Sequence, residues 1–147
     1  MIAHEAASPL CFVDSNIWLY ALIEGEDADK SARARQVIQQ GSLCISAQVI
    51  NEVCQNLIRK AGMAESVIQE LIESFHRKYI VALVSREVML KASALRVRHS
   101  FSFWDSQIVA AALSVGADIL YSEDMDGGLV LDSGMRIVNP FVSDPPG

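Results

Sequence analysis

Four acidic residues lie either directly after a candidate strand or early in a candidate helix. They are Asp14, Glu52, Asp105 and Asp124. In a parallel sheet, the strand ends and the helix starts that follow them lie at the same edge, so acids far apart in the sequence can converge there. Clustered carboxylates repel one another and are costly to desolvate unless a divalent cation neutralises them. Oxygen ligands suit Mg²⁺ or Mn²⁺ rather than zinc, and such sites hydrolyse phosphodiesters through an activated water.

Each acid also has an ordinary structural explanation. Asp14 would cap the helix that follows it, and Asp105 lies three residues after Ser102, as in a capping box. On a helical wheel Glu52 projects away from the centre of the apolar stripe, as a solvated glutamate does. Asp124 lies in a segment with the acidic and glycine residues typical of turns. The shared position of the four acids, rather than any one of them, therefore indicates a site.

The elements that would position these acids alternate along the chain. Strands are expected over residues 10–13, 43–45, 81–84, 117–121 and 135–138, and helices over 17–23, 28–40, 47–61, 64–78, 87–99 and 103–115. Ser46 is expected to cap the helix over 47–61, and Gly41 and Gly62 end two of the helices. The run over 81–84 reads as a buried strand, like the run over 10–13. The alternation predicts an α/β fold with a parallel sheet covered on both faces.

Length and composition predict one globular domain over residues 1–147, with a flexible extension over 1–8 and a tail over 141–147. The chain is 51% hydrophobic, which provides for a sizeable core. No apolar run approaches the roughly 20 residues that span a bilayer, and residues 1–9 lack the basic charge of a signal peptide. Three cysteines without metal-ligand spacing suggest reduced thiols in the cytoplasm.

The charge distribution limits the choice of partner. The formal net charge of −6 argues against tight, non-specific binding to duplex nucleic acid, but a carboxylate metal site would itself contribute negative charge. Six of the twelve basic residues lie between positions 77 and 98. A solvated helix face is the more common explanation of such a run.

Four stretches, in order, resemble motifs of the PIN-domain ribonucleases, whose bacterial members include the VapC toxins of toxin–antitoxin pairs. They are Phe12–Ile17, Ile45–Glu52, Phe103–Ser106 and Asp118–Met125. The resemblance covers nearly all of the chain between Leu10 and Pro140. It implies a three-layer α/β/α sandwich with a central parallel sheet of about five strands. It also implies a Mg²⁺- or Mn²⁺-dependent endoribonuclease that cleaves single-stranded or structured RNA.

The resemblance assigns roles residue by residue. The family's acidic positions, which are catalytic and hold the metal, fall on Asp14, Glu52, Asp105 and Asp124. Its supporting polar positions fall on Asn16 and Ser122, and Asn16 equally fits an ordinary helix start. Asp126 is a further candidate that would bind metal directly or through water, and Glu123 is a weaker one.

The resemblance also implies partners. A homodimer is expected, for which apolar residues of the helices from Ile17 and Ala64 would serve, although core packing explains them equally well. A toxin would in addition bind a small antitoxin protein near the site. RNA would be held by basic residues at the rim, and the candidates are Arg86, Lys91, Arg96, Arg98 and His99.

Two alternatives remain open on the sequence. A strand-end aspartate such as Asp14 is also the nucleophile of phosphatases and phosphotransferases that form an aspartyl-phosphate. Haloacid-dehalogenase-type phosphatases have a second aspartate two residues later, and Asn16 stands there instead. The other alternative is a non-catalytic binding module that keeps the PIN fold.

Overall fold

The computed structural model describes residues 8–25 and 27–142. The strands are β1 (Leu10–Val13), β2 (Ser42–Ser46), β3 (Ile80–Ala82), β4 (Ile119–Tyr121) and β5 (Arg136–Val138). The helices are α1 (Ser15–Leu22), α2 (Ala28–Gln39), α3 (Ala47–Ala61), α4 (Glu65–Lys78), α5 (Arg86–Arg98) and α6 (Phe103–Ser114). Most of the expected extension (1–8) and tail (141–147) lies outside the described residues. Within the described ranges, every helix is too short or too polar to cross a membrane.

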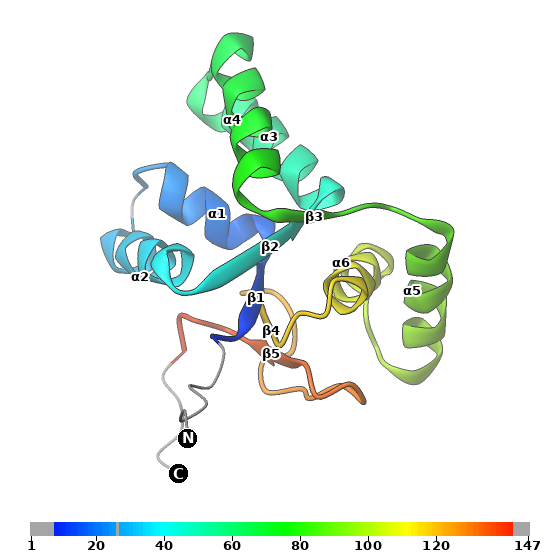
Figure 1. Ribbon diagram of the computed structural model, residues 1–147. Coiled ribbons are helices and arrows are strands. Elements are labelled where there is room, and N and C mark those ends of the chain that lie inside the picture. Colours follow the sequence, from blue (N-terminus) through cyan, green and yellow to red (C-terminus); the bar gives the residue numbers. More distant parts are fainter. Residues whose placement is uncertain (1–7, 26, 143–147) are drawn as a thin grey trace, which may run out of the picture.

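The five strands form one parallel sheet in the order β3-β2-β1-β4-β5. Figure 1 shows α1 and α2 on one side of this sheet and α5 and α6 on the other, while α3 and α4 pack together beyond β2 and β3. The expected three-layer α/β/α sandwich with a five-stranded parallel sheet is confirmed. β1 lies at its centre, and its residues Cys11, Phe12 and Val13 are buried, as a strand covered on both faces requires.

Local signals place α3 where the sequence predicts it. The Ser46 hydroxyl accepts a hydrogen bond from the backbone N–H of Val49 at 3.2 Å, and Gly62 ends the helix with φ +60°. Between these ends, one face of α3 is buried against the rest of the molecule by Val49, Ile50, Val53, Cys54 and Leu57. The opposite face is free to present polar side chains.

The interpretation of residues 81–84 as a buried strand is wrong in two respects. β3 spans Ile80–Ala82 and stands at the edge of the sheet, where it pairs with β2. Leu83 and Val84 lie beyond it and are 70% and 56% exposed. An apolar run does not reveal whether its strand is central or at the edge, because that depends on the order of the strands in the sheet.

Candidate active site

The acidic edge, by which we mean the carboxyl ends of β1 and β4 with Asp14, Glu52, Asp105 and Asp124, lies where the strand order reverses across the sheet. From β1 the chain proceeds to β2 on one side, and it returns later to place β4 on the other side of β1. Ligands of open α/β sheets bind at the carboxyl ends of the strands at such a switch point. Val13 is in register with Tyr121, so the next residues, Asp14 and Ser122, stand side by side. The Ser122 hydroxyl donates to Oδ2 of Asp14 at 2.8 Å.

Asp14 is a buried carboxylate, exposed to only 7%. Its Oδ1 accepts a hydrogen bond from the backbone N–H of Ser15 at 2.7 Å and thereby caps α1. Burial and, to a lesser extent, the nearby Glu52 and Asp105 carboxylates raise the pKa of Asp14 to about 6, against the hydrogen bonds from Ser122 and Ser15. The capping explanation is therefore correct but incomplete, because an ordinary helix cap is not desolvated beside other acids.

Glu52 is held by hydrogen bonds to both of its carboxylate oxygens. The Ser15 hydroxyl donates to Oε2 at 2.7 Å, and Nε2 of Gln48 donates to Oε1 at 2.9 Å. Gln48 lies one helical turn before Glu52, so the two side chains share a face of α3. Ser15 and Gln48 were not among the predicted site residues. The four-residue spacing was the available signal for Gln48, whereas the contact of Ser15 depends on how α1 packs against α3.

Asp105 lies in the first turn of α6, where Ser102 caps the helix. The Ser102 hydroxyl accepts a hydrogen bond from the backbone N–H of Asp105 at 3.1 Å. Burial raises the pKa of the Asp105 carboxyl, and the carboxylates of Asp124 and Glu52 add to the rise against the hydrogen bond with Ser102. Asp14, Glu52 and Asp105 thus lie within electrostatic reach of one another, and Asp124 lies within reach of Asp105.

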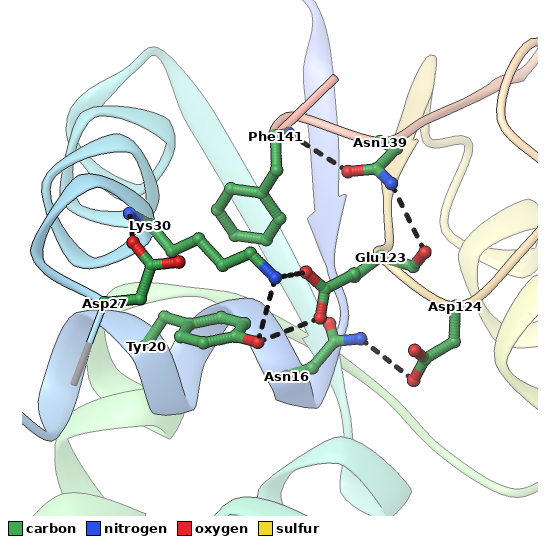
Figure 2. Close-up of polar contacts among 8 residues, drawn as sticks. All are labelled: Asn16, Tyr20, Asp27, Lys30, Glu123, Asp124, Asn139 and Phe141. Carbon is green, nitrogen blue, oxygen red and sulfur yellow. Dashed lines mark hydrogen bonds and ion pairs between the residues drawn. The ribbon is translucent and has the colours of Figure 1, made fainter. Parts of the chain in front are cut away.

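Asp124 is connected to α1 through Asn16. Nδ2 of Asn16 donates to Oδ2 of Asp124 at 3.1 Å, as Figure 2 shows. Oδ1 of the same amide is buried without a hydrogen-bond partner in the described part of the chain. The functional roles expected for Asn16 and Ser122 stay predictions, but both side chains contact an acid of the site.

The residue before Asp124 turns to a different partner (Figure 2). Glu123 forms an ion pair with Nζ of Lys30 at 2.5 Å and accepts a hydrogen bond from the Tyr20 hydroxyl at 3.0 Å. These contacts tie the segment after β4 to α1 and α2, so Glu123 positions this segment rather than joining the four acids. Asp126 is exposed, and its backbone carbonyl accepts from Leu129 N–H at 3.5 Å, as in a turn.

The candidate RNA-binding residues do not form one surface beside the acids. The Arg96 guanidinium donates to the Ser106 hydroxyl at 2.6 Å and lies 4.5 Å from the Phe103 ring, near the start of α6. Arg98 pairs with Asp132, and the exposed Arg86 lies 3.7 Å from Glu87. Lys91, Arg98 and His99 line a separate cavity whose walls contain none of the four acids.

A groove of about 790 Å³ borders the site and was not predicted. Its walls include Gln48, Asn51, Glu52, Phe103, Trp104 and Gln107. We call it the Trp104 groove, because Trp104, which is 63% exposed, lines it. The signal in the sequence was the pair Phe103-Trp104 directly before Asp105, since two large aromatics in a first helical turn are unusual unless something covers them.

The donor set fits a hard divalent cation. Its oxygens come from carboxylates. The Asp14 carboxylate is desolvated by burial, and a bound cation would compensate for the lost contacts with water. Among the residues that the structure describes, no three His, Cys, Asp or Glu side chains are close enough to hold a metal ion as they stand. The acids therefore share one electrostatic environment without forming a ready-made cage.

Solved structures with similar folds come from several bacteria. A toxin–antitoxin complex from Klebsiella pneumoniae is 17% identical, with a TM-score of 0.65 over 89% of this chain and 98% of that one. VapC20 of Mycobacterium tuberculosis, described as a toxin that cleaves the sarcin–ricin loop, is 25% identical, with a TM-score of 0.64 over 79% and 91%. FitAcB from Neisseria gonorrhoeae is 13% identical, with a TM-score of 0.58 over 89% and 98%.

The sequence itself matches one protein family. Comparison with curated proteins gave no match. The family described as PIN domain matches residues 11–127, which contain all but the first residue of β1, all of β2 to β4, and all four acids. This match covers most of the chain and agrees with the fold and with the order of the acidic motifs. The chain therefore belongs to the PIN-domain family.

Proposed function

We propose that this protein is a metal-dependent endoribonuclease and the toxin of a toxin–antitoxin pair. The observation that carries the proposal is the buried Asp14 at the switch point, whose pKa is raised to about 6 beside the Glu52 and Asp105 carboxylates. Such a group keeps its negative charge at neutral pH at a cost that a divalent cation would offset. Repulsion from the neighbouring carboxylates adds to this cost, and cation binding would relieve it.

Each acid would then have a distinct task. Asp14, Asp105 and Asp124 would hold Mg²⁺ or Mn²⁺, with Ser122 and Asn16 fixing the orientation of two of them. When bound, the divalent ion would supply Lewis-acid chemistry, making water more acidic and stabilising charge on the phosphate. Glu52, already fixed by Ser15 and Gln48, would orient the attacking water.

The proposed partners rest on the structural neighbours. Several of them are toxin–antitoxin proteins, which supports a small antitoxin for this chain. We also propose a homodimer and a cytoplasmic location, the latter supported by three free, buried cysteines. In the expected dimer helices, Ile17, Ile68 and Phe75 are buried in the core, whereas Leu22 and Val67 are exposed to 43% and 45% and remain available.

RNA cleavage with Mg²⁺ or Mn²⁺ tests the proposed activity. We expect wild-type protein to cleave single-stranded RNA internally, a chelator to abolish cleavage, and Asp14→Asn or Asp105→Asn to lower kcat at least a hundredfold, as loss of an activating group does. Asp29→Asn removes an exposed acid in α2 and serves as the control. A folded Asp14→Asn protein that cleaves RNA as fast as wild type would refute the mechanism.

Calorimetry separates the nuclease from a non-catalytic module with the same fold. The nuclease is expected to bind Mn²⁺ with an affinity that falls in Asp14→Asn and Asp105→Asn. A wild-type protein that binds no divalent metal, although all four acids are present, would favour the binding module.

A further inference from the structure

The Trp104 groove lies directly beside the acids of the candidate active site. Trp104 precedes Asp105 in the first turn of α6, and Glu52 belongs both to the groove wall and to the acidic edge. The Trp104 ring lies edge-on to Phe103, at 5.1 Å between centroids and an interplanar angle of 81°. The Arg96 guanidinium covers Phe103 at 4.5 Å from its centroid. Phe103 therefore contacts two partners although it is itself 53% exposed, and Trp104 presents the more exposed aromatic surface of the two.

A buried acceptor without a partner also lines this groove. Gln107 is 8% exposed, and its Oε1 has no hydrogen-bond partner among the described residues. Leaving a buried acceptor unpaired costs stability. An apolar residue at this helix position would avoid the cost, and a turn of the Gln107 amide toward the groove that it lines would let Oε1 accept a donor from a ligand.

The chemistry of the groove matches a nucleobase. A base offers a flat aromatic face for stacking and, at its edge, N–H donors and acceptors. The groove places an exposed indole next to amide side chains, and Gln48, Asn51 and Gln107 are three of these. An apolar peptide side chain would cover the indole but leave Oε1 of Gln107 unpaired. A phosphate would meet the carboxylate of Glu52 and is disfavoured.

We propose that Trp104 stacks on an RNA base adjacent to the scissile phosphate and that Oε1 of Gln107 accepts a hydrogen bond from the edge of that base. This inference rests on the proposed function, because the acids next to the groove define where the phosphate lies. Trp104 would contribute affinity without regard to base identity. Gln107 would contribute a preference among bases, and hence part of the cleavage-site specificity.

Tryptophan fluorescence tests stacking without requiring cleavage. The protein has two tryptophans, and the other one, Trp18, is 3% exposed in the core. Titration of the full chain in chelator with single-stranded oligoribonucleotides of each base should quench the exposed Trp104, and Trp104→Phe should lose that quenching. In anisotropy measurements with a labelled oligoribonucleotide, Trp104→Ala should bind roughly 5- to 150-fold more weakly, the range for loss of one stacked base. Trp104→Phe should retain most of the affinity.

Two further variants sharpen the test. Leu90→Ala removes an apolar side chain that is 64% exposed, like Trp104, but lies outside the groove, and should bind RNA as wild type does. Gln107→Leu should unfold at the same or a higher temperature because it removes an unpaired buried acceptor, yet lose preference among the oligoribonucleotides. An unchanged order of preference in Gln107→Leu would overturn its assignment to the base edge.

Failure of this inference and failure of the nuclease assignment give different results. If wild type cleaves RNA but shows no quenching, and Trp104→Ala keeps its KM, stacking is refuted while the nuclease stands, and the groove is left to a protein partner. If quenching and weaker binding by Trp104→Ala occur without any metal-dependent cleavage, stacking is supported and the nuclease is refuted.

Discussion

At the scale of single residues, Asp14 shows how structural and chemical demands meet in one side chain. One oxygen caps α1 by accepting from the Ser15 N–H, and the other accepts a hydrogen bond from the hydroxyl of Ser122, directly after the neighbouring strand β4. Both contacts favour the charged form, yet burial outweighs them and raises the pKa to about 6. The fold thus positions a carboxylate at some cost to its own stability, which is typical of a functional site.

Replacing this carboxylate should stabilise the metal-free protein. Because the folded state binds the Asp14 proton more tightly than the unfolded state does, this group favours folding most below its unfolded pKa, and the advantage is lost as pH rises through about 6. Asn keeps the helix cap without a charge. We therefore expect Asp14→Asn to be more stable than wild type by roughly 1–3 kcal/mol at pH 7.5, and by much less at pH 4. Urea unfolding in chelator at both pH values measures this difference, and a destabilised variant at pH 7.5 would contradict the desolvation argument.

Asn16 provides a second test at this scale. Its Nδ2 fixes Asp124, and loss of such a partner typically lowers metal affinity by about 10–100-fold. We expect this loss in Asn16→Ala by Mn²⁺ calorimetry. Asn56→Ala, whose amide donates to the α3 backbone, is the control and should bind Mn²⁺ normally. Equal affinities of Asn16→Ala and wild type would exclude a role for Asn16 in orienting the ligand.

At the scale of elements, the parts that sequence predicts well are those with local causes. The bounds of β1 and α3 agree with the sequence prediction because an apolar run, a serine cap and a terminal glycine define them. α1 begins at Ser15 rather than Ile17, since Asp14 caps it directly. The edge position of β3 depends on strand order, which no local pattern encodes.

The candidate site likewise contains features that the sequence predicts and features that depend on how the elements pack. The approach of the four acids follows from one general property of parallel sheets, so it was predictable. The pairing of Ser15 with Glu52 and of Lys30 with Glu123 depends on how helices pack against each other and against the segment after β4. The Trp104 groove likewise requires the N-terminal parts of α3 and α6 to line one groove.

Gly62 allows a test of the local signal that ends α3. Its φ of +60° is a conformation that side chains disfavour, while a Cβ there would meet nothing within 4 Å. Gly62→Ala should therefore cost about 1 kcal/mol of stability through backbone strain alone. Gly25→Ala also meets nothing within 4 Å but needs no positive φ, so it should change stability by less than about 0.5 kcal/mol. Denaturant unfolding of both variants compares them, and equal stabilities would show that the α3 terminus relaxes without strain.

At the scale of the whole molecule, the reactivity of the three cysteines measures how often the core opens to solvent. Cys11, Cys44 and Cys54 lie in β1, β2 and α3, and all are free and buried. Burial raises the pKa of each thiol, and Asp118 and Glu65 add to the rise at Cys11 and Cys54. The pKa of the Cys44 thiol is raised to about 12, chiefly by burial. Because the thiolate is the reactive form, labelling of the native protein must wait for the core to open.

The rate of thiol labelling should therefore show whether metal binding stabilises the folded protein against global unfolding. A ligand that binds the folded state alone lowers the unfolded population by the factor 1 + [L]/Kd, which is about a hundredfold at a hundred times Kd. We expect Mg²⁺ to slow labelling of all three cysteines by one common factor in wild type, and to have little effect in Asp14→Asn, which lacks a proposed ligand. Labelling by a chromogenic disulfide reagent, followed by mass spectrometry of each cysteine, measures the three rates. One thiol that reacts quickly whether or not Mg²⁺ is present would reveal local opening of its element, and the core would then not unfold as a single unit.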